Sequence, residues 1–161
     1  MKVTILALGK LKEKYWKEAL AEYLRRLSAY GKVELIELPD YGAQEGSPQQ
    51  IAEKEGKDIL KRLQQLSALG GDTHIIALDS KGKQLSSEDL SKHLDELKLR
   101  GKSKLVFIIG GSHGLPPEVL KQAHESLSFG KQTWPHNMAR VMLAEQIYRA
   151  NTISNNHPYH K

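Results

Sequence analysis

The chain has 161 residues, a length that fits one domain. Its 24 Lys and Arg residues outnumber the 19 Asp and Glu residues, which leaves a net charge of +5, and 39% hydrophobic with 27% charged residues exclude the disordered and fibrous classes. Because the chain has no cysteine, disulfides, thiolate nucleophiles and cysteine-ligated metals are excluded, and a reducing compartment is indicated.

Hydropathy and charge also indicate where the protein acts. No apolar run approaches the roughly 18 residues of a membrane span, and the apolar stretch at residues 3–8 is too short for a signal peptide. We therefore expect a cytoplasmic protein without a membrane partner. The excess positive charge favours a polyanionic partner such as RNA, although an ordinary basic enzyme has the same composition.

The first part of the chain predicts two strands and a helix, followed by a loop. A β-branched apolar run predicts a buried strand over residues 1–8, and an apolar stripe at helical spacing predicts a helix over residues 16–27. A second strand is expected over residues 33–38. Residues 39–47 (PDYGAQEGS) have the composition of a linker, and we expect them to be mobile.

The middle of the chain continues the alternation of helices and strands. A capping box with a first-turn proline at residues 47–50 predicts a helix that ends before the glycine pair at 70–71. A strand over residues 74–78, a helix capped by Ser86 and a strand over residues 104–109 follow. This order predicts an α/β fold, a mainly parallel sheet with helices on its faces, whose ligands bind beyond the carboxyl ends of the strands.

The last third ends in a long helix that is apolar almost all the way round. A helix that begins at Pro116 and a short apolar segment at residues 127–129 precede it. Over residues 137–150 the apolar side chains cover most of the circumference, so this helix needs burial on two sides. A homodimer interface would provide the second side, and we expect one; a central place in the core is the alternative.

A glycine-rich loop, GGSHG at residues 110–114, follows the strand at 104–109. Its glycine spacing excludes the dinucleotide-binding fingerprint, and GKS at 101–103 is no phosphate-binding loop, because Glu96 stands where a glycine is needed. The loop does match G-x-S-x-G, the nucleophile motif of serine hydrolases, with Ser112 as nucleophile. No aspartate follows Ser112 to complete a triad, so we expect it to be a loop residue and keep the hydrolase as an alternative.

The histidines predict no metal site. His157 and His160 are three residues apart, but Pro158 lies between them and no third ligand accompanies them. Three further histidines are assigned structural or surface roles: His74, His93 and His124. We therefore expect no bound metal.

Aromatic and basic side chains gather around the last helix and at the end of the chain. They are Lys131, Trp134, His136 and Arg140 near the start of the helix, Arg149 near its end, and Tyr159, His160 and Lys161 in the tail. Such side chains stack on bases and contact phosphates. Chain termini often fray without a function, so residue chemistry leaves two alternatives: a tail that contacts RNA and a frayed tail without a function.

Six segments together carry a resemblance to a known family. They are GKLKEKYW (9–16), EYLRRL (22–27), ALDSKGK (77–83), IIGGSHGL (108–115), LSFGKQTWPHNMARVMLAEQIYRA (127–150) and NHPYHK (156–161). With these segments, the chain resembles the small SPOUT-superfamily methyltransferases that modify N3 of a pseudouridine in large-subunit ribosomal RNA. The match spans essentially the whole chain, and the combination of segments is highly specific.

The resemblance implies a fold and a cofactor. The chain would be a single SPOUT domain over residues 1–161, with five strands and a C-terminal trefoil knot of about residues 75–161, one of the rare exceptions to unknotted topology. S-adenosylmethionine would bind in the knot. Its contacts would be Leu78, Gly110, Phe129, Gly130, Lys131, Gln132, Thr133 and Trp134.

The resemblance also implies a homodimer whose active site combines the knot of one protomer with the tail of its partner. The imide nitrogen that accepts the methyl group is mostly protonated at neutral pH, so attack needs a base or surroundings that favour the anion. By residue type the base is His136, Glu145 or His160; Arg149 would stabilise charge on the uracil ring, and Tyr159 would meet RNA together with His160. Alternatively, Glu145 only pairs with Arg149 one helical turn away.

Three alternatives to this function are open. They are another RNA specificity within the SPOUT superfamily, a serine hydrolase that uses Ser112, and an RNA-binding module without catalysis. The absence of cysteine excludes methylation of pyrimidine C5 through a covalent cysteine adduct, whereas direct transfer to nitrogen or oxygen needs no such residue.

Overall fold

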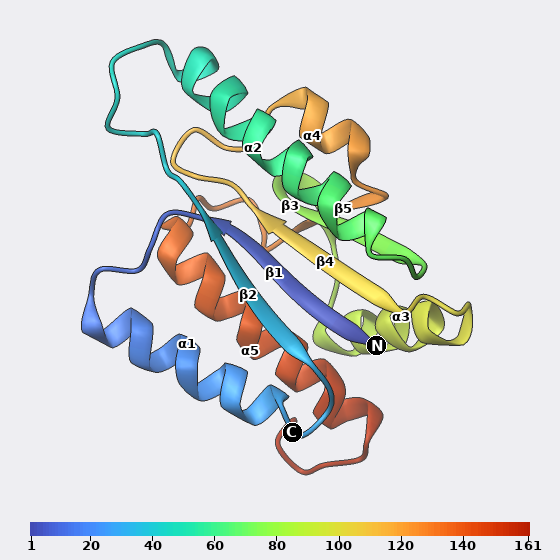
Figure 1. Ribbon diagram of the computed structural model, residues 1–161. Helices are drawn as coiled ribbons and strands as arrows, with labels where there is room; N and C mark the ends of the chain where they lie inside the picture. Colours follow the sequence, from blue (N-terminus) through green and yellow to red (C-terminus); the bar gives the residue numbers. More distant parts are fainter.

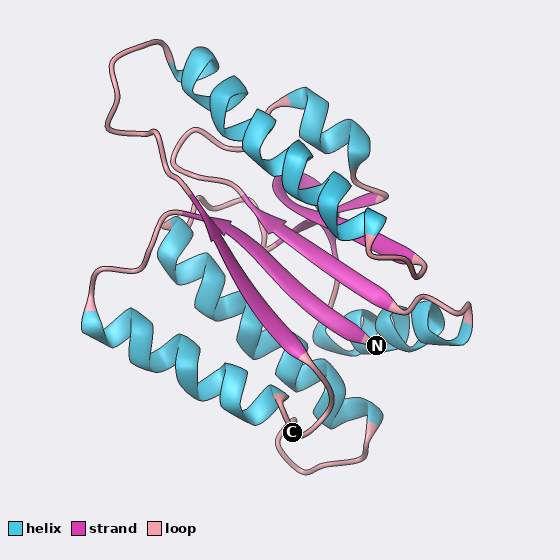
Figure 2. Ribbon diagram, in the orientation of Figure 1, coloured by secondary structure: helices cyan, strands magenta, loops and turns pink.

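The computed structural model describes all residues from 1 to 161 as ten helices and strands in alternation (Figure 1). They are β1 (Lys2–Leu8), α1 (Lys14–Leu27), β2 (Val33–Leu38), α2 (Pro48–Ala68), β3 (Thr73–Gln84), α3 (Ser87–Leu99), β4 (Lys104–Ile109), α4 (Pro117–Gln122), β5 (Glu125–Ser128) and α5 (His136–Ser154). The five strands form one sheet in the order β2-β1-β4-β3-β5, and every neighbouring pair is parallel (Figure 2). The predicted α/β fold with a parallel sheet is therefore confirmed.

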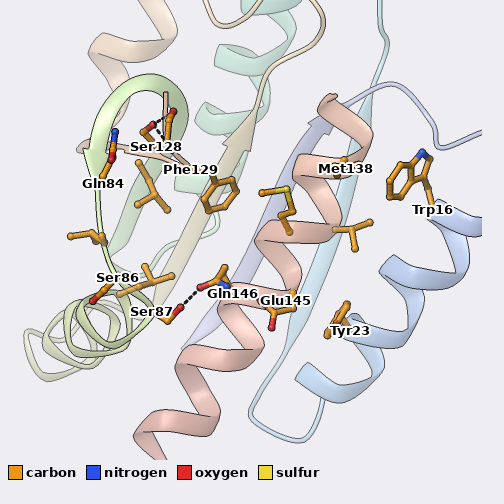
Figure 3. A pocket seen from close by; sticks show the side chains of 16 residues that line it. Trp16, Tyr23, Gln84, Ser86, Ser87, Ser128, Phe129, Met138, Glu145 and Gln146 are labelled. Carbon is orange, nitrogen blue, oxygen red and sulfur yellow. Dashed lines mark hydrogen bonds between the residues drawn. The ribbon is translucent and has the colours of Figure 1, made fainter. Parts of the chain in front are cut away.

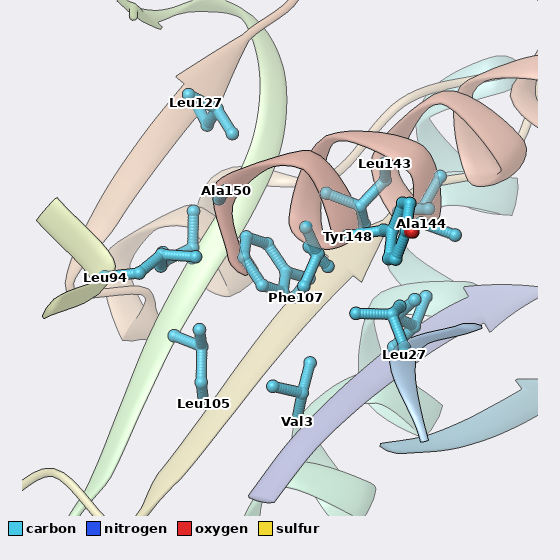
Figure 4. Close-up of a cluster of buried hydrophobic side chains, with 14 of the residues drawn as sticks. Val3, Leu27, Leu94, Leu105, Phe107, Leu127, Leu143, Ala144, Tyr148 and Ala150 are labelled. Atoms are coloured by element: carbon cyan, nitrogen blue, oxygen red, sulfur yellow. The ribbon is translucent and has the colours of Figure 1, made fainter. Parts of the chain in front are cut away.

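Helices cover both faces of the sheet (Figure 1). Helices α1, α3 and α5 pack on one face around a core that includes Phe107 and Leu105 from β4, Leu143 from α5 and Leu27 from α1 (Figure 4). Helices α2 and α4 cover the other face through a smaller core. No helix is both long and apolar enough to cross a membrane.

The helix starts that the sequence predicts are present with their caps. Ser47 Oγ accepts a hydrogen bond from the Gln50 backbone N–H (3.1 Å), and Gln50 Oε1 accepts one from the Ser47 N–H (3.0 Å). Ser86 Oγ accepts from the Asp89 N–H (3.0 Å) at the start of α3. Both predictions rested on local chemistry, because a cap satisfies backbone donors of its own first turn.

The strand predicted over 74–78 is longer in the structure and curls around its neighbour. Leu78 and Lys83 of β3 both pair with Leu127 of β5, so the four residues between them bulge outward. Gly82 packs so closely that a Cβ there would lie 2.7 Å from the Ser126 carbonyl carbon. The curl thus packs around the short edge strand β5, of which the sequence indicated only an apolar segment.

Helix α5 lies between α1 and α3 on one face of the sheet. Leu143, Ala144 and Ile147 are completely buried there. Met138 and Met142 are half-buried and line a groove instead. One part of the apolar circumference of α5 therefore lies in the core, which was the alternative to a dimer interface. Another part faces a groove.

Candidate active site

A cavity of about 590 Å³ opens at the carboxyl ends of β3 and β4, where ligands bind in parallel α/β sheets. Seven of the eight residues that the resemblance assigns to the cofactor line it: Leu78, Gly110, Phe129, Gly130, Gln132, Thr133 and Trp134. The eighth, Lys131, is exposed in the same segment and is not part of the lining. His136, at the start of α5, also faces this cavity.

The glycine loop after β4 builds one wall of the cavity as a closed turn. The Gly114 N–H donates to the Gly111 carbonyl (3.1 Å), and Gly114 has a φ of +74°, which favours glycine. A Cβ on Gly110 would lie 2.9 Å from the Gly114 carbonyl carbon. Only a residue without a side chain fits at position 110, so main-chain atoms form this wall.

The segment after β5 forms the opposite wall. Ser128 is buried, and its hydroxyl accepts a hydrogen bond from the Gly130 N–H (3.1 Å) and lies 3.1 Å from the Ser80 carbonyl oxygen. Trp134 Nε1 donates to the Phe129 carbonyl (3.4 Å). The Trp134 side chain is still 38% exposed, which leaves an aromatic surface open at the cavity.

Ser112 lines the cavity, but nothing activates it as a nucleophile. The structure shows no hydrogen bond between its Oγ and a histidine or carboxylate. Three histidines could serve as its base: His136 lines the same cavity but makes no hydrogen bond with Ser112, and His157 and His160 lie in the tail beyond α5. The parts of a hydrolase triad are not assembled in this chain.

Four of the five candidate catalytic residues meet in a cluster at the other end of α5. Arg149 Nη2 lies 2.6 Å from Glu145 Oε1, and the Tyr159 hydroxyl donates to the same oxygen (3.0 Å). Arg149 Nη1 lies 3.1 Å from His160 Nδ1, and His160 Nε2 lies 2.7 Å from Glu88 Oε1. We call these four residues, Glu145, Arg149, Tyr159 and His160, the tail cluster.

Electrostatics limit what the tail cluster can do. The hydrogen bonds with Glu145 raise the pKa of Arg149, so its guanidinium stays charged. Burial, with hydrogen bonds to Tyr23 and Glu145, raises the pKa of Tyr159, so its phenol stays neutral. The guanidinium also lies 4.7 Å from the Tyr159 ring centroid, a cation–π contact that holds the tail on the helix.

The tail cluster and the cavity are far apart within one chain. Glu145 and Arg149 follow His136 by nine and thirteen residues on α5, which corresponds to about 14 Å and about 20 Å along a helix. The chain therefore does not bring its own tail to its own cavity.

A groove of about 580 Å³ runs between these two places (Figure 3). Trp16 of α1, Phe129, and Met138, Val141 and Met142 of α5 give it an apolar surface. Phe129 and Gly130 also line the cavity, so the groove and the cavity share a wall. The apolar circumference of α5 was the signal for this surface, but the sequence did not show that Trp16 faces it.

A buried carboxyl group that the sequence analysis did not identify supports the glycine loop from behind. Glu55 on α2 is 1% exposed, and its Oε2 accepts a hydrogen bond from the Tyr41 N–H (3.0 Å) while Oε1 has no partner. A Cβ on Gly111 would lie 3.3 Å from both oxygens. Burial, together with the neighbouring carboxyl group of Asp40, raises the pKa of Glu55 to about 7. The signal was a glutamate on the apolar face of α2, four residues from both Ile51 and Ile59.

A family comparison identifies the fold. The model described as "Predicted SPOUT methyltransferase" matches residues 1–160. The chain belongs to the SPOUT methyltransferase family. Two curated relatives, from Bacillus thuringiensis (strain Al Hakam) and Bacillus cereus (strain B4264), are 52% identical over the full length of both chains, and each is named "Ribosomal RNA large subunit methyltransferase H".

Solved structures share the SPOUT fold at low sequence identity. A probable methylase family protein from Haemophilus influenzae Rd KW20 has a TM-score of 0.54 and 14% identity, with 99% of this chain and 70% of that chain covered. The putative methyltransferase Lpg2936 from Legionella pneumophila, solved with bound SAM, has a TM-score of 0.51 and 13% identity over 94% of this chain and 66% of that chain. At this identity the likeness supports the fold.

Proposed function

We propose that this SPOUT chain is an S-adenosylmethionine-dependent methyltransferase that modifies N3 of a pseudouridine in large-subunit ribosomal RNA. One observation carries the proposal. The residues that the family resemblance assigns to the cofactor come from three separate segments of the chain, and the fold collects seven of them around one cavity. The printed names of the full-length relatives support the choice of ribosomal RNA as substrate.

The cavity fits the proposed cofactor. Leu78, Phe129 and Trp134 offer apolar walls to the adenine ring, and the main chain at Gly110 and Gly130 approaches closely because neither residue has a side chain. When bound, S-adenosylmethionine supplies an electrophilic methyl group on a sulfonium centre. The protein then has to align the acceptor nitrogen with this methyl group and exclude water. The two walls of the cavity favour both.

We assign to His136 the role of the general base that removes the proton from the acceptor nitrogen. It is the one base candidate that lines the cavity, whereas Glu145 is paired with Arg149 and His160 with Glu88. Imidazole is the side chain that most often serves as a general base in enzymes. Arg149 would stabilise negative charge on the uracil ring, with Tyr159 beside it for stacking.

We further propose a homodimer in which the partner's tail completes each site. The separation of His136 from the tail cluster along α5 requires a second chain if both act on one nucleotide. The apolar groove beside the cavity is the surface that a partner would cover. Ribosomes as substrate would place the dimer in the cytoplasm.

We also propose that the C-terminal part, about residues 75–161, forms the trefoil knot of the family. The support is the curl of β3 around β5, where Ser128 touches the Ser80 carbonyl and Gly82 packs on the β5 backbone (Figure 3 shows the curl beside Gln84 and Ser128). In such a knot the cofactor segment after β5 is held on both sides.

The test of the function is methyl transfer from radiolabelled S-adenosylmethionine to ribosomes, 50S subunits or naked large-subunit rRNA that lack the modification. We expect label in the RNA, and nuclease digestion with mass spectrometry should place it on N3 of a pseudouridine. His136→Ala should lose most of the transfer, whereas Ser112→Ala should keep it. Absence of label from every ribosomal substrate would overturn the proposal, and loss of activity in Ser112→Ala alone would favour a role for that hydroxyl.

A further inference from the structure

Two histidines and a glutamate meet at the end of the sheet that lies opposite the cavity. His74 is near the start of β3, His93 is on α3 and Glu125 begins β5. His74 Nε2 lies 2.9 Å and His93 Nε2 lies 2.5 Å from the same oxygen, Glu125 Oε1. The three potential ligand atoms all lie within 4.8 Å of one another.

Each of the three side chains can offer an electron pair to a cation without a large movement. Both imidazoles direct Nε2 at the carboxylate, and the structure shows no protein partner for Nδ1 of either ring. If the ring proton moves to Nδ1, which is an ordinary tautomer change, each Nε2 lone pair becomes free. The carboxylate oxygen already lies between the two nitrogens.

The surroundings hold the ligand set and leave it open to solvent. The side chains of His74, His93 and Glu125 are 13%, 28% and 31% exposed. His124 stacks on His74 with ring centroids 4.8 Å apart, and His124 Nδ1 accepts a hydrogen bond from the Ile75 N–H (2.9 Å), which fixes this ring on β3. Contacts of this kind around a metal site hold the ligand side chains in position.

We propose that His74, His93 and Glu125 form a binding site for a divalent zinc ion. Two imidazole nitrogens and one carboxylate oxygen are a ligand set that Zn²⁺ prefers, and the exposed side leaves the fourth tetrahedral position to water. The sequence alone predicted structural or surface roles for His74 and His93, because ligands from β3, α3 and β5 are far apart along the chain.

The position of the site indicates a structural role for the ion. Glu125 is the first residue of β5, a four-residue strand at the edge of the sheet, and the cofactor segment begins directly after this strand. Glu125 lies two and three residues before Leu127 and Ser128, which line the cavity, so about 7–10 Å of strand keep the ion out of contact with a substrate there. It would instead fasten β5 to β3 and α3.

The test uses tag-free protein stripped of metal with EDTA, Zn²⁺ titrated by calorimetry, and Co²⁺ as an absorbing substitute. We expect one ion per chain and a melting temperature that rises by about 5 °C or more at saturation. His93→Ala and Glu125→Gln should each weaken binding by about tenfold or more. His157→Ala, which changes an exposed tail histidine, is the matched control and should bind like the unaltered chain.

Proton NMR of the unaltered chain covers the case in which a variant does not fold. Zn²⁺ should shift the ring signals of His74 and His93 and leave those of His113 and His157 in place. The proposal is overturned if no saturable one-to-one binding occurs, or if the signals of the tail histidine move instead. Neither result depends on methyl transfer, so this test is separate from that of the proposed function.

Discussion

Arg140 of α5 and Glu37 of β2 form a partly buried ion pair, with Nη1 2.8 Å from Oε2. Arg140 is 1% exposed, and its Nη2 also donates to the carbonyls of Leu8 (3.0 Å) and Gly9 (3.2 Å) at the end of β1. Burial lowers the pKa of the guanidinium, and Glu37 opposes that shift. This one side chain ties the start of α5, and with it the cavity wall at His136, to the carboxyl ends of two strands.

Arg140→Ala should therefore lower the free energy of unfolding by about 3–5 kcal/mol, because it leaves a cavity in place of a fully buried side chain and two strand-end carbonyls lose their donor. Glu37→Gln keeps a hydrogen-bond acceptor beside the guanidinium, and its loss should be smaller. Urea unfolding followed by circular dichroism measures both. A loss below about 1 kcal/mol for Arg140→Ala would contradict the assigned role.

Glu55 makes the stability depend on pH. The pKa of Glu55 is about 7 in the folded chain, whereas the ordinary value of 4.5 applies to the unfolded chain. The folded state therefore binds the proton more firmly than the unfolded state. The stabilisation is complete below about pH 4.5 and is lost as the pH rises to about 7, by as much as about 3 kcal/mol. Asp40, Asp58 and the Tyr41 N–H are the groups that face this carboxyl.

Glu55→Gln should remove this slope, since an amide does not titrate. The measurement is urea unfolding at several pH values between 4.5 and 7.5, with Glu53→Gln on the exposed side of α2 as the matched control. The prediction is wrong if Glu55→Gln and the unaltered chain lose stability equally across that range.

Gly110→Ala should weaken binding of S-adenosylmethionine without unfolding the chain. The new methyl group would lie 2.9 Å from the Gly114 carbonyl carbon and would push the glycine loop into the cavity. Overpacking costs about 1–3 kcal/mol, which corresponds to about fivefold to about 150-fold in affinity if the cost is paid on binding. Calorimetry with the cofactor measures the change. Ser112→Ala, in the same loop, should bind normally, and equal losses in both variants would argue against a specific role of Gly110.

A composite site in a homodimer predicts complementation between two inactive chains. His136→Ala damages the cavity side and deletion of residues 156–161 removes the tail, so each alone should transfer almost no methyl groups. Co-expressed in equal amounts, half of the dimers would be mixed, with one intact site each, which gives about a quarter of the unaltered activity.

Both variants should still dimerise and the tail deletion should still bind cofactor, which analytical ultracentrifugation and calorimetry check. Activity in the tail deletion alone would show that the tail is not needed. Absence of complementation in mixed dimers of proven composition would place both groups in the same protomer.

The sequence alone was sufficient for features that depend on neighbouring residues. The strands at 33–38 and 104–109 have the predicted bounds, and the helices that begin after Ser47 and Ser86 have the predicted caps. Apolar periodicity and capping act within one or two turns of chain, so their signal is present in the local sequence. The order of these elements was enough to predict the parallel α/β sheet.

Only the tertiary structure decided which distant residues meet. The curl of β3 at Asp79–Gln84 carries no apolar pattern, and its shape follows from close packing of Gly82 on β5. Glu55 lies behind Gly111, and His74, His93 and Glu125 share one oxygen, because chain crossovers bring them together. Length, charge and local pattern thus determined a basic α/β domain. The gathering of its cavity, and the separation of that cavity from the tail cluster, arise from long-range packing, which leaves no periodic signal in the sequence.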